Sequence, residues 1–178
     1  MKKEFTGKVS IIHDADNNKI ALINDVVFKG RTSIKWDDVE NYLKNYVGEC
    51  YSIAEDNEIV YIGADLPSEY SGSVYTKRLK GANAKAKANA AQSIPEMIEI
   101  ATNATFEVNR KEKHKRSAQK GWYRYDTRFA IPIYNETGEI DRYNVYFCRL
   151  LIRHASSGKK YLYDITEIKK ETGKSCQA

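Results

Sequence analysis

Residues 109–125, with the sequence NRKEKHKRSAQKGWYRY, bring cationic side chains, a histidine and aromatic rings together in one short stretch. The histidine is His114, and the stretch closes on Trp122, Tyr123 and Tyr125. Imidazole exchanges a proton near neutral pH, Lys and Arg attract phosphates, and aromatic rings stack on unpaired bases. The combination predicts a site for a phosphate-bearing chain. The alternative is a solvated, charged connection between two structural elements.

This set of residue types suits one reaction in particular. RNA is cleaved without a metal ion when its own 2′-hydroxyl attacks the adjacent phosphate, which requires a base, cations around the phosphorane and an acid for the leaving 5′-oxygen. His114 is the candidate acid or base, and Arg124, Arg149 and Arg153 are candidate phosphate ligands. Arg149 and Arg153 are four residues apart in a predicted strand, so they point to the same side. The alternatives are an exposed histidine in a Lys-rich loop and a solvated strand face.

The net charge is unevenly distributed along the chain. Residues 77–128 carry 13 basic and 5 acidic residues, whereas residues 1–76 carry 8 basic and 13 acidic residues. A local positive field draws anions, of which nucleic acid is the commonest large one. Trp122 follows Gly121 and is either a stacking residue or a core anchor at the start of a strand. The residues expected to contact nucleic acid are Lys85, Lys87, Arg110, Lys111, Lys113, Lys115, Arg116, Lys120 and Trp122.

Other site classes have little support in the sequence. His13, His114 and His154 have no second His or Cys at ligand spacing, and no acidic run resembles a calcium loop. The glycine-rich phosphate loops GxxxxGK[ST] and GxGxxG are missing, as is the hydrolase motif GxSxG. We therefore expect neither a metal site nor a cofactor.

The three cysteines are far apart and odd in number, the chain begins with a polar segment, and no apolar run approaches the length of a membrane span. These features predict reduced thiols in a cytoplasm and no membrane partner.

The fold class predicted from the hydrophobic pattern is α+β. The first 63 residues read as a small β-β-α-β-β unit, with hairpins at 8–30 and 50–63 around a helix at 33–50. Residues 64–81 are rich in Pro, Gly and Ser and predict a linker. Two helices follow, and then an antiparallel meander of three strands, or four if residues 105–108 pair. The predicted division is 1–63 for the N-terminal unit, 64–81 for the linker, 82–172 for the second domain and 173–178 for a polar tail.

The part of the chain from about residue 70 to residue 171 resembles C-terminal modules of large polyvalent proteins of phages and mobile elements. The segments that carry the resemblance are EYSGS, AKANAAQSIPEMIEIATNA, NRKEKHKRSAQKGWYRY, FAIPIY and YLYDITEIKKE. Those modules are grouped with the barnase–EndoU–colicin–RelE-like (BECR) nucleases, in which helices precede a small antiparallel sheet whose open face carries the active site. The resemblance implies metal-independent RNA cleavage, with motif positions at Lys111, His114, Arg124, Arg149, Arg153 and Tyr161.

Three functions follow as hypotheses. The first is an RNA-binding protein of phage or mobile-element origin that acts as a metal-independent endoribonuclease. The second is a non-enzymatic phage accessory or anti-defence protein that binds a host protein or nucleoprotein. The third is an assembly protein whose sheet edges pair in oligomers.

Overall fold

The structure is a computed structural model that describes residues 9–29 and 33–176, with residues 172–176 described by their backbone only. One eight-stranded sheet connects the described parts of the chain, in the order β1-β2-β6-β7-β8-β4-β3, with β5 also paired to β6. The strands are β1 (Val9–His13), β2 (Lys19–Ile23), β3 (Cys50–Ser52), β4 (Ile59–Tyr61), β5 (Thr102–Glu107), β6 (Trp122–Tyr134), β7 (Ile140–His154) and β8 (Lys160–Cys176).

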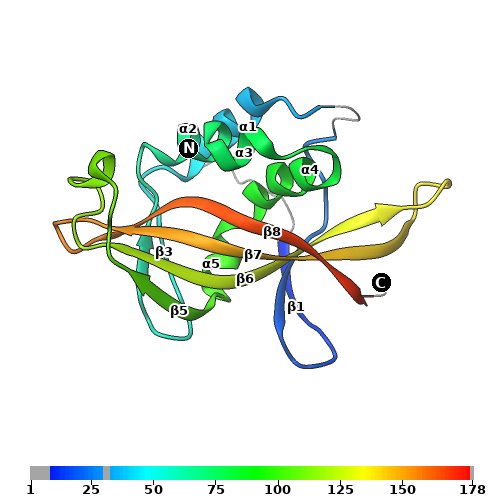
Figure 1. The fold of residues 1–178 in the computed structure, drawn as a ribbon. Coiled ribbons are helices and arrows are strands. Elements are labelled where there is room, and N and C mark those ends of the chain that lie inside the picture. Colours follow the sequence, from blue (N-terminus) through cyan, green and yellow to red (C-terminus); the bar gives the residue numbers. More distant parts are fainter. Residues whose placement is uncertain (1–8, 30–32, 177–178) are drawn as a thin grey trace.

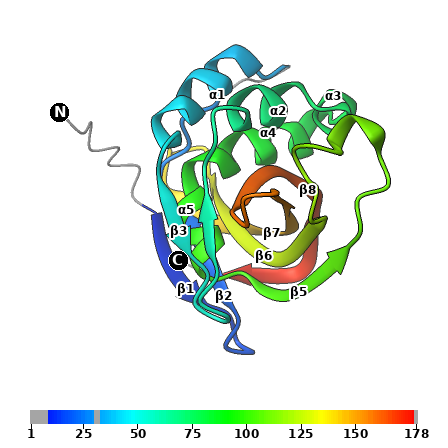
Figure 2. The same cartoon turned by 90° about the vertical axis from the view of Figure 1, so that its left-hand side faces the viewer.

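Five α-helices and three short 3-10 helices accompany this sheet in the described residues. They are α1 (Trp36–Leu43), η1 (Lys44–Tyr46), α2 (Leu66–Gly72), α3 (Val74–Arg78), α4 (Gly81–Ala90), η2 (Ala91–Ser93), α5 (Ile94–Glu99) and η3 (Glu112–His114). Helices α1 to α4 lie together on one side of the long strands, and β1 lies on the other (Figure 1). The view in Figure 2 shows how the sheet curls beneath the helices. None of the described helices is both long enough and apolar enough to cross a lipid bilayer.

The predicted α+β class, both N-terminal hairpins and the antiparallel meander are confirmed. β1 pairs with β2, and β3 pairs with β4, each antiparallel. β6, β7 and β8 form the meander, and β5 adds the fourth strand by pairing with β6. In the first hairpin, the Asp14 carboxylate accepts hydrogen bonds from the backbone N–H groups of Asp16 and Asn18, which explains why Asp and Asn occupy this turn.

The segment 64–81, expected to be a linker, is helical instead. It forms α2 and α3, and Leu66, Tyr70 and Thr76 are buried. Pro67 sits in the first turn of α2, where its missing N–H costs no helical hydrogen bond. The Ser73 hydroxyl accepts the Thr76 N–H and so caps α3. The Pro, Gly and Ser residues here therefore start and end short helices.

Strands from both predicted units belong to the same sheet. β2 pairs in parallel with β6, and β4 pairs in parallel with β8. One core cluster likewise combines Val39, Leu43 and Ile53 with Ile98 and Leu150. The predicted N-terminal unit is thus built into the same core as the second domain.

The C-terminal tail predicted at 173–178 differs from the structure as well. Strand β8 continues to Cys176, whose backbone lies opposite Tyr143 of β7. Backbone hydrogen bonding to a neighbouring strand does not require apolar side chains, so the polar composition of this segment gave no sign of the strand. Residues 177–178 lie outside the described residues.

Candidate functional site

A pocket of about 460 Å³ lies between the α2–α3 corner and the connection from β5 to β6. This connection arches toward α3 (Figure 2). The floor of the pocket is formed by residues of strands β6 to β8, namely Trp122, Arg124, Leu151, Tyr163, Asp164 and Thr166. The α2–α3 corner forms one wall with Glu69, Gly72, Ser73, Val74 and Tyr75. The end of β5 and the connection to β6 form the other wall with Glu107, Val108, Asn109, Arg110, Lys111, Lys113 and His114. We call this cavity the site pocket.

Three rings meet edge to face in the site pocket. The ring centroids of His114, Trp122 and Tyr163 lie 5.1–5.3 Å apart, with interplanar angles of 76–88°. The Trp122 indole N–H donates to the Asn109 side-chain oxygen over 3.2 Å. The histidine predicted as acid or base and the tryptophan predicted to stack on bases are therefore in direct contact.

Tyr163 reaches this cluster because the sheet register slips beside it. Asp164 lies opposite Leu151 and Leu162 lies opposite Ile152, so Tyr163 is the extra residue of a β-bulge. Bulges re-aim side chains and are common next to active sites. Alternation along the strand gave no reason to choose Tyr163 over Tyr161, and the sequence prediction chose Tyr161.

Glu69 and Tyr163 both line the site pocket, and the sequence prediction included neither residue. Burial raises the pKa of Tyr163, and the neighbouring Glu69 carboxylate raises it further. The phenol therefore keeps its proton at neutral pH and is a hydrogen-bond donor. Glu69 belongs to the EYSGS segment, but nothing in its spacing links it to His114 or Tyr163.

His114 ends the short helix η3 and is half-buried. Burial lowers its pKa below 6.5, Lys113 lowers it further, and Glu69 opposes both effects. The imidazole is consequently neutral at pH 7. Its Nδ1 lies 3.4 Å from the Ser117 hydroxyl.

The three predicted arginines occupy one face of the sheet but have different surroundings. Arg124 lines the site pocket and forms an ion pair of 2.6 Å with Glu107. Arg149 does not line the pocket and is paired with the carboxylates of Asp126 and Glu167, which raise its pKa.

Arg153 lies close enough to His114 to lower the pKa of the imidazole. Its guanidinium binds the Asp65 carboxylate at 3.2 Å, donates to the Ser117 carbonyl and stacks 4.2 Å from the centre of the Tyr161 ring. Arg153 and Tyr161 thus support the loop that carries His114, and neither lines the site pocket.

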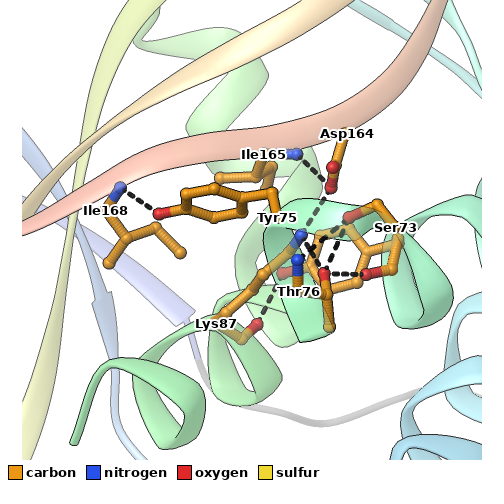
Figure 3. A network of polar contacts seen from close by, with 8 residues as sticks. Ser73, Tyr75, Thr76, Lys87, Asp164, Ile165 and Ile168 are labelled. Carbon is orange, nitrogen blue, oxygen red and sulfur yellow. Dashed lines mark hydrogen bonds and ion pairs between the residues drawn. The ribbon is translucent and has the colours of Figure 1, made fainter. Parts of the chain in front are cut away.

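Lys87, expected to contact nucleic acid, is buried inside the protein. Its ammonium group lies 2.6 Å from the Asp164 carboxylate and 2.5 Å from the Thr76 hydroxyl, and the Asp164 carboxylate also accepts the Ile165 N–H (Figure 3). The rings of Tyr70 and Tyr75 lie 4.6 Å and 5.0 Å from the ammonium group. Lys87 therefore has no surface to offer a ligand, and the prediction for this residue is wrong.

Further hydrogen bonds tie the α2–α3 corner to α4 and β8. The Tyr70 hydroxyl donates to the Lys87 carbonyl of α4, and within the corner itself the Ser73 hydroxyl donates to that of Thr76. The Tyr75 hydroxyl accepts the Ile168 N–H over 2.7 Å (Figure 3). These contacts fix the wall of the site pocket that carries Glu69 against the strand that carries Tyr163.

The other predicted cations fall into separate groups. Arg110, Lys111 and Lys113 line the site pocket. Lys113 also lines a second cavity of about 740 Å³, together with Glu112, Lys115, Arg116, Gln119 and Ser156. We call this cavity the basic groove.

The remaining two predicted cations line neither cavity. Lys85 lines a distant cavity next to Lys80 and Trp36. Lys120 is exposed and donates its backbone N–H to the His154 carbonyl.

In the described part of the chain, no three His, Cys, Asp or Glu side chains gather in a way that would hold a metal ion. Comparisons of the chain with protein-family models, curated proteins and solved structures gave no match.

Proposed function

We propose that the protein binds RNA at the site pocket and cleaves it without a metal ion, through attack of the 2′-hydroxyl on the adjacent phosphate. The observation that carries the proposal is the meeting of His114, Tyr163 and Glu69 with Arg124 in one pocket. The cationic residues at this pocket supply the attraction for phosphate. A phage or mobile-element origin and a location in the cytoplasm of a bacterial host belong to the same proposal.

The protonation states of His114 and Tyr163 decide which residue acts as the base and which as the acid. Neutral His114 takes the proton of the 2′-hydroxyl, because its lowered pKa leaves the imidazole free to accept one at pH 7. Tyr163 holds its proton at this pH and donates it to the leaving 5′-oxygen. Arg124 balances the charge of the phosphorane once substrate phosphate replaces Glu107 as its partner. The product carries a 2′,3′-cyclic phosphate.

A non-enzymatic binder is the second candidate function. Arg124, Arg149 and Arg153 are each paired with a carboxylate of the protein itself, so none of the three offers an uncompensated charge to phosphate. A host protein or nucleoprotein is the partner in this case. Its binding would tolerate salt better than phosphate contacts do.

The decisive experiment is a cleavage assay on mixed RNA in the presence of EDTA. The variants are His114→Ala and Arg124→Ala, and the matched control is Lys44→Ala, an exposed lysine beside α1. We expect products with 2′,3′-cyclic ends from the wild type and the control, and a loss of at least about 100-fold in the His114 variant. Circular dichroism establishes that the variants are folded.

Two results of this assay would count against the proposal. Equal cleavage by wild type and His114→Ala would overturn the site assignment. Absence of cleavage by every protein, with RNA binding retained, would favour the second candidate.

A further inference from the structure

The site pocket and the basic groove are neighbouring parts of one surface. Lys113 lines both cavities, and the short helix η3 carries residues of each. Beyond Lys113, the groove presents Lys115 and Arg116. A polyanion that leaves the site pocket past Lys113 therefore meets further cations at once.

The cations of the groove are available to a ligand, in contrast to the arginines of the sheet. Lys115 lies 3.7 Å from Glu112, and their side chains are 76% and 89% exposed. Exposed ion pairs of this kind contribute little to stability, because water screens the attraction between their charges. A phosphate can therefore replace Glu112 as the partner of Lys115 at a small cost in free energy, whereas Arg149 is held by two carboxylates.

The size of the site pocket limits what it can hold. Its volume of about 460 Å³ lies in the range of pockets that take one small ligand. In a duplex the bases are stacked and paired, so an enzyme reaches a single nucleotide only if that nucleotide leaves the stack. A pocket of this size accepts one nucleotide and not a helical segment.

Apolar side chains at the site pocket match the face of a base. Val74 on α3 is 65% exposed, and Val108 after β5 is 64% exposed. Together with Trp122 and Leu151 they give the pocket an apolar lining beside its cations. Exposed valines next to an aromatic ring suit the flat, apolar face of an unpaired base.

We infer that the site pocket holds one unpaired nucleotide and that the basic groove holds the phosphates of the adjoining nucleotides, so that the ligand is single-stranded RNA. This inference rests on the proposed function for the chemical class of the ligand. It does not depend on cleavage, because it concerns binding alone.

The test compares three probes that cannot be cleaved. They are a labelled 2′-O-methyl RNA hexamer of mixed sequence, the same hexamer joined covalently to its complement through a polyethylene glycol linker so that the duplex stays closed at low salt, and the four nucleoside 5′-monophosphates. The variant Lys115→Ala/Arg116→Ala removes two charges from the groove. The variant Lys35→Ala/Lys44→Ala removes two exposed charges near α1 and serves as the charge-matched control.

We expect the groove variant to bind the single-stranded hexamer about tenfold more weakly at low salt, with a shallower salt dependence. Its affinity for the monophosphates, measured by calorimetry, should stay within about twofold of wild type, because they fill the site pocket only. The control variant should match the wild type with every probe. The duplex should bind more weakly than the single strand.

Equal weakening of hexamer and monophosphate binding by the groove variant would overturn the inference, as would a duplex that binds as tightly as the single strand. If the expected binding pattern is found and RNA is not cleaved in the assay described above, the inference is supported and the proposed enzymatic function is overturned. Cleavage without a preference for single strands would overturn the inference alone. Failure to bind any of the probes would overturn the inference, and it would overturn the proposed function as well if RNA is also not cleaved in the assay described above.

Discussion

The ammonium group of Lys87 lies 2.6 Å from the carboxylate of Asp164, and both side chains are almost completely buried. Lys87 comes from α4, whereas Asp164 comes from the bulged part of β8, next to Tyr163. Burial lowers the pKa of Lys87 and raises that of Asp164, and the attraction between the two charges opposes both shifts. The pair therefore links the helical layer to the strand segment that forms the site pocket.

Removing one member of this pair should be costly. Lys87→Met leaves the Asp164 carboxylate buried without its cation, and breaking a buried pair in this way costs about 3–5 kcal/mol. Replacing both partners, as Lys87→Met/Asp164→Leu, should cost less than Lys87→Met alone, because no unpaired charge remains. Urea unfolding measures these free energies. Lys85→Met on the exposed side of the same helix is the control, and an equal stability of Lys87→Met and Lys85→Met would contradict the expectation.

The contrast between Lys85 and Lys87 shows that the sequence pattern does not indicate which side of this helix is buried. Both lie in the Ala-rich segment ANAKAKANAAQ, two residues apart, which places them on different sides of a helix. The segment has no apolar stripe to indicate which side faces the core, since Ala fits either environment. Lys87 becomes buried because Asp164 and Thr76, which are distant in sequence, complete its hydrogen bonds.

The hairpins and the meander were predictable because their signals are local. Alternating apolar residues and the Asp, Asn and Gly residues of the turns specify antiparallel neighbours in sequence order. The parallel pairings of β2 with β6 and of β4 with β8 join distant segments and leave no local mark. The supposed linker was misread because Pro, Gly and Ser also serve at helix ends.

The candidate site was predicted in part. His114, Trp122 and Arg124 come close together because a short connection and one strand carry all three. Glu69 enters from a helix that the sequence did not predict, and Tyr163 enters through a bulge. Neither a distant helix nor a one-residue register shift can be read from spacing.

His114 should titrate below pH 6.5, because burial and Lys113 both disfavour its charged form. Lys113→Gln should raise this pKa, and Glu69→Gln should lower it further, since Glu69 stabilises the imidazolium. NMR titration of the imidazole C–H signals measures both changes. If neutral His114 is the base, the cleavage rate increases as the pH rises through this pKa and levels off above it. Shifts of the same sign in the two variants would contradict the assigned surroundings.

The same lowered pKa has a consequence for stability. The folded state binds a proton at His114 more weakly than the unfolded chain does, so stability is lost as the pH falls from the unfolded value near 6.5 through the folded value. His114→Gln should lose less stability than wild type between pH 7.5 and pH 5. Urea unfolding at the two pH values provides the measurement, and equal losses would contradict the lowered pKa.

Gly121 should not tolerate a side chain. Its φ of +101° is unfavourable for L-residues, and a Cβ atom would lie 2.7 Å from both the Glu107 carbonyl oxygen and the Phe106 ring. Gly121→Ala should therefore cost about 3 kcal/mol or more and displace Trp122. Gly138→Ala is the control, since its φ of +83° carries the backbone penalty alone, about 1 kcal/mol, with open space around the Cβ. Equal losses for the two variants in urea unfolding would contradict the close contact.

Glu96→Gln should stabilise the protein at neutral pH. The Glu96 Oε2 atom is buried without a hydrogen-bond partner among the described residues, and burial raises the pKa of this carboxyl. The folded state therefore favours the protonated carboxyl. At pH values above the pKa that Glu96 has in the folded state, the buried charge lowers the stability of the protein.

Glutamine removes that charge, and the expected gain is about 1 kcal/mol at pH 7.5. As the pH falls through the folded pKa toward the unfolded value of 4.5, wild-type Glu96 takes up its proton and the gain should shrink. Urea unfolding at pH 7.5 and pH 5 measures the difference, with exposed Glu136→Gln as the control. A gain of the same size at both pH values would show that the amide acts through new hydrogen bonds and not through removal of a buried charge.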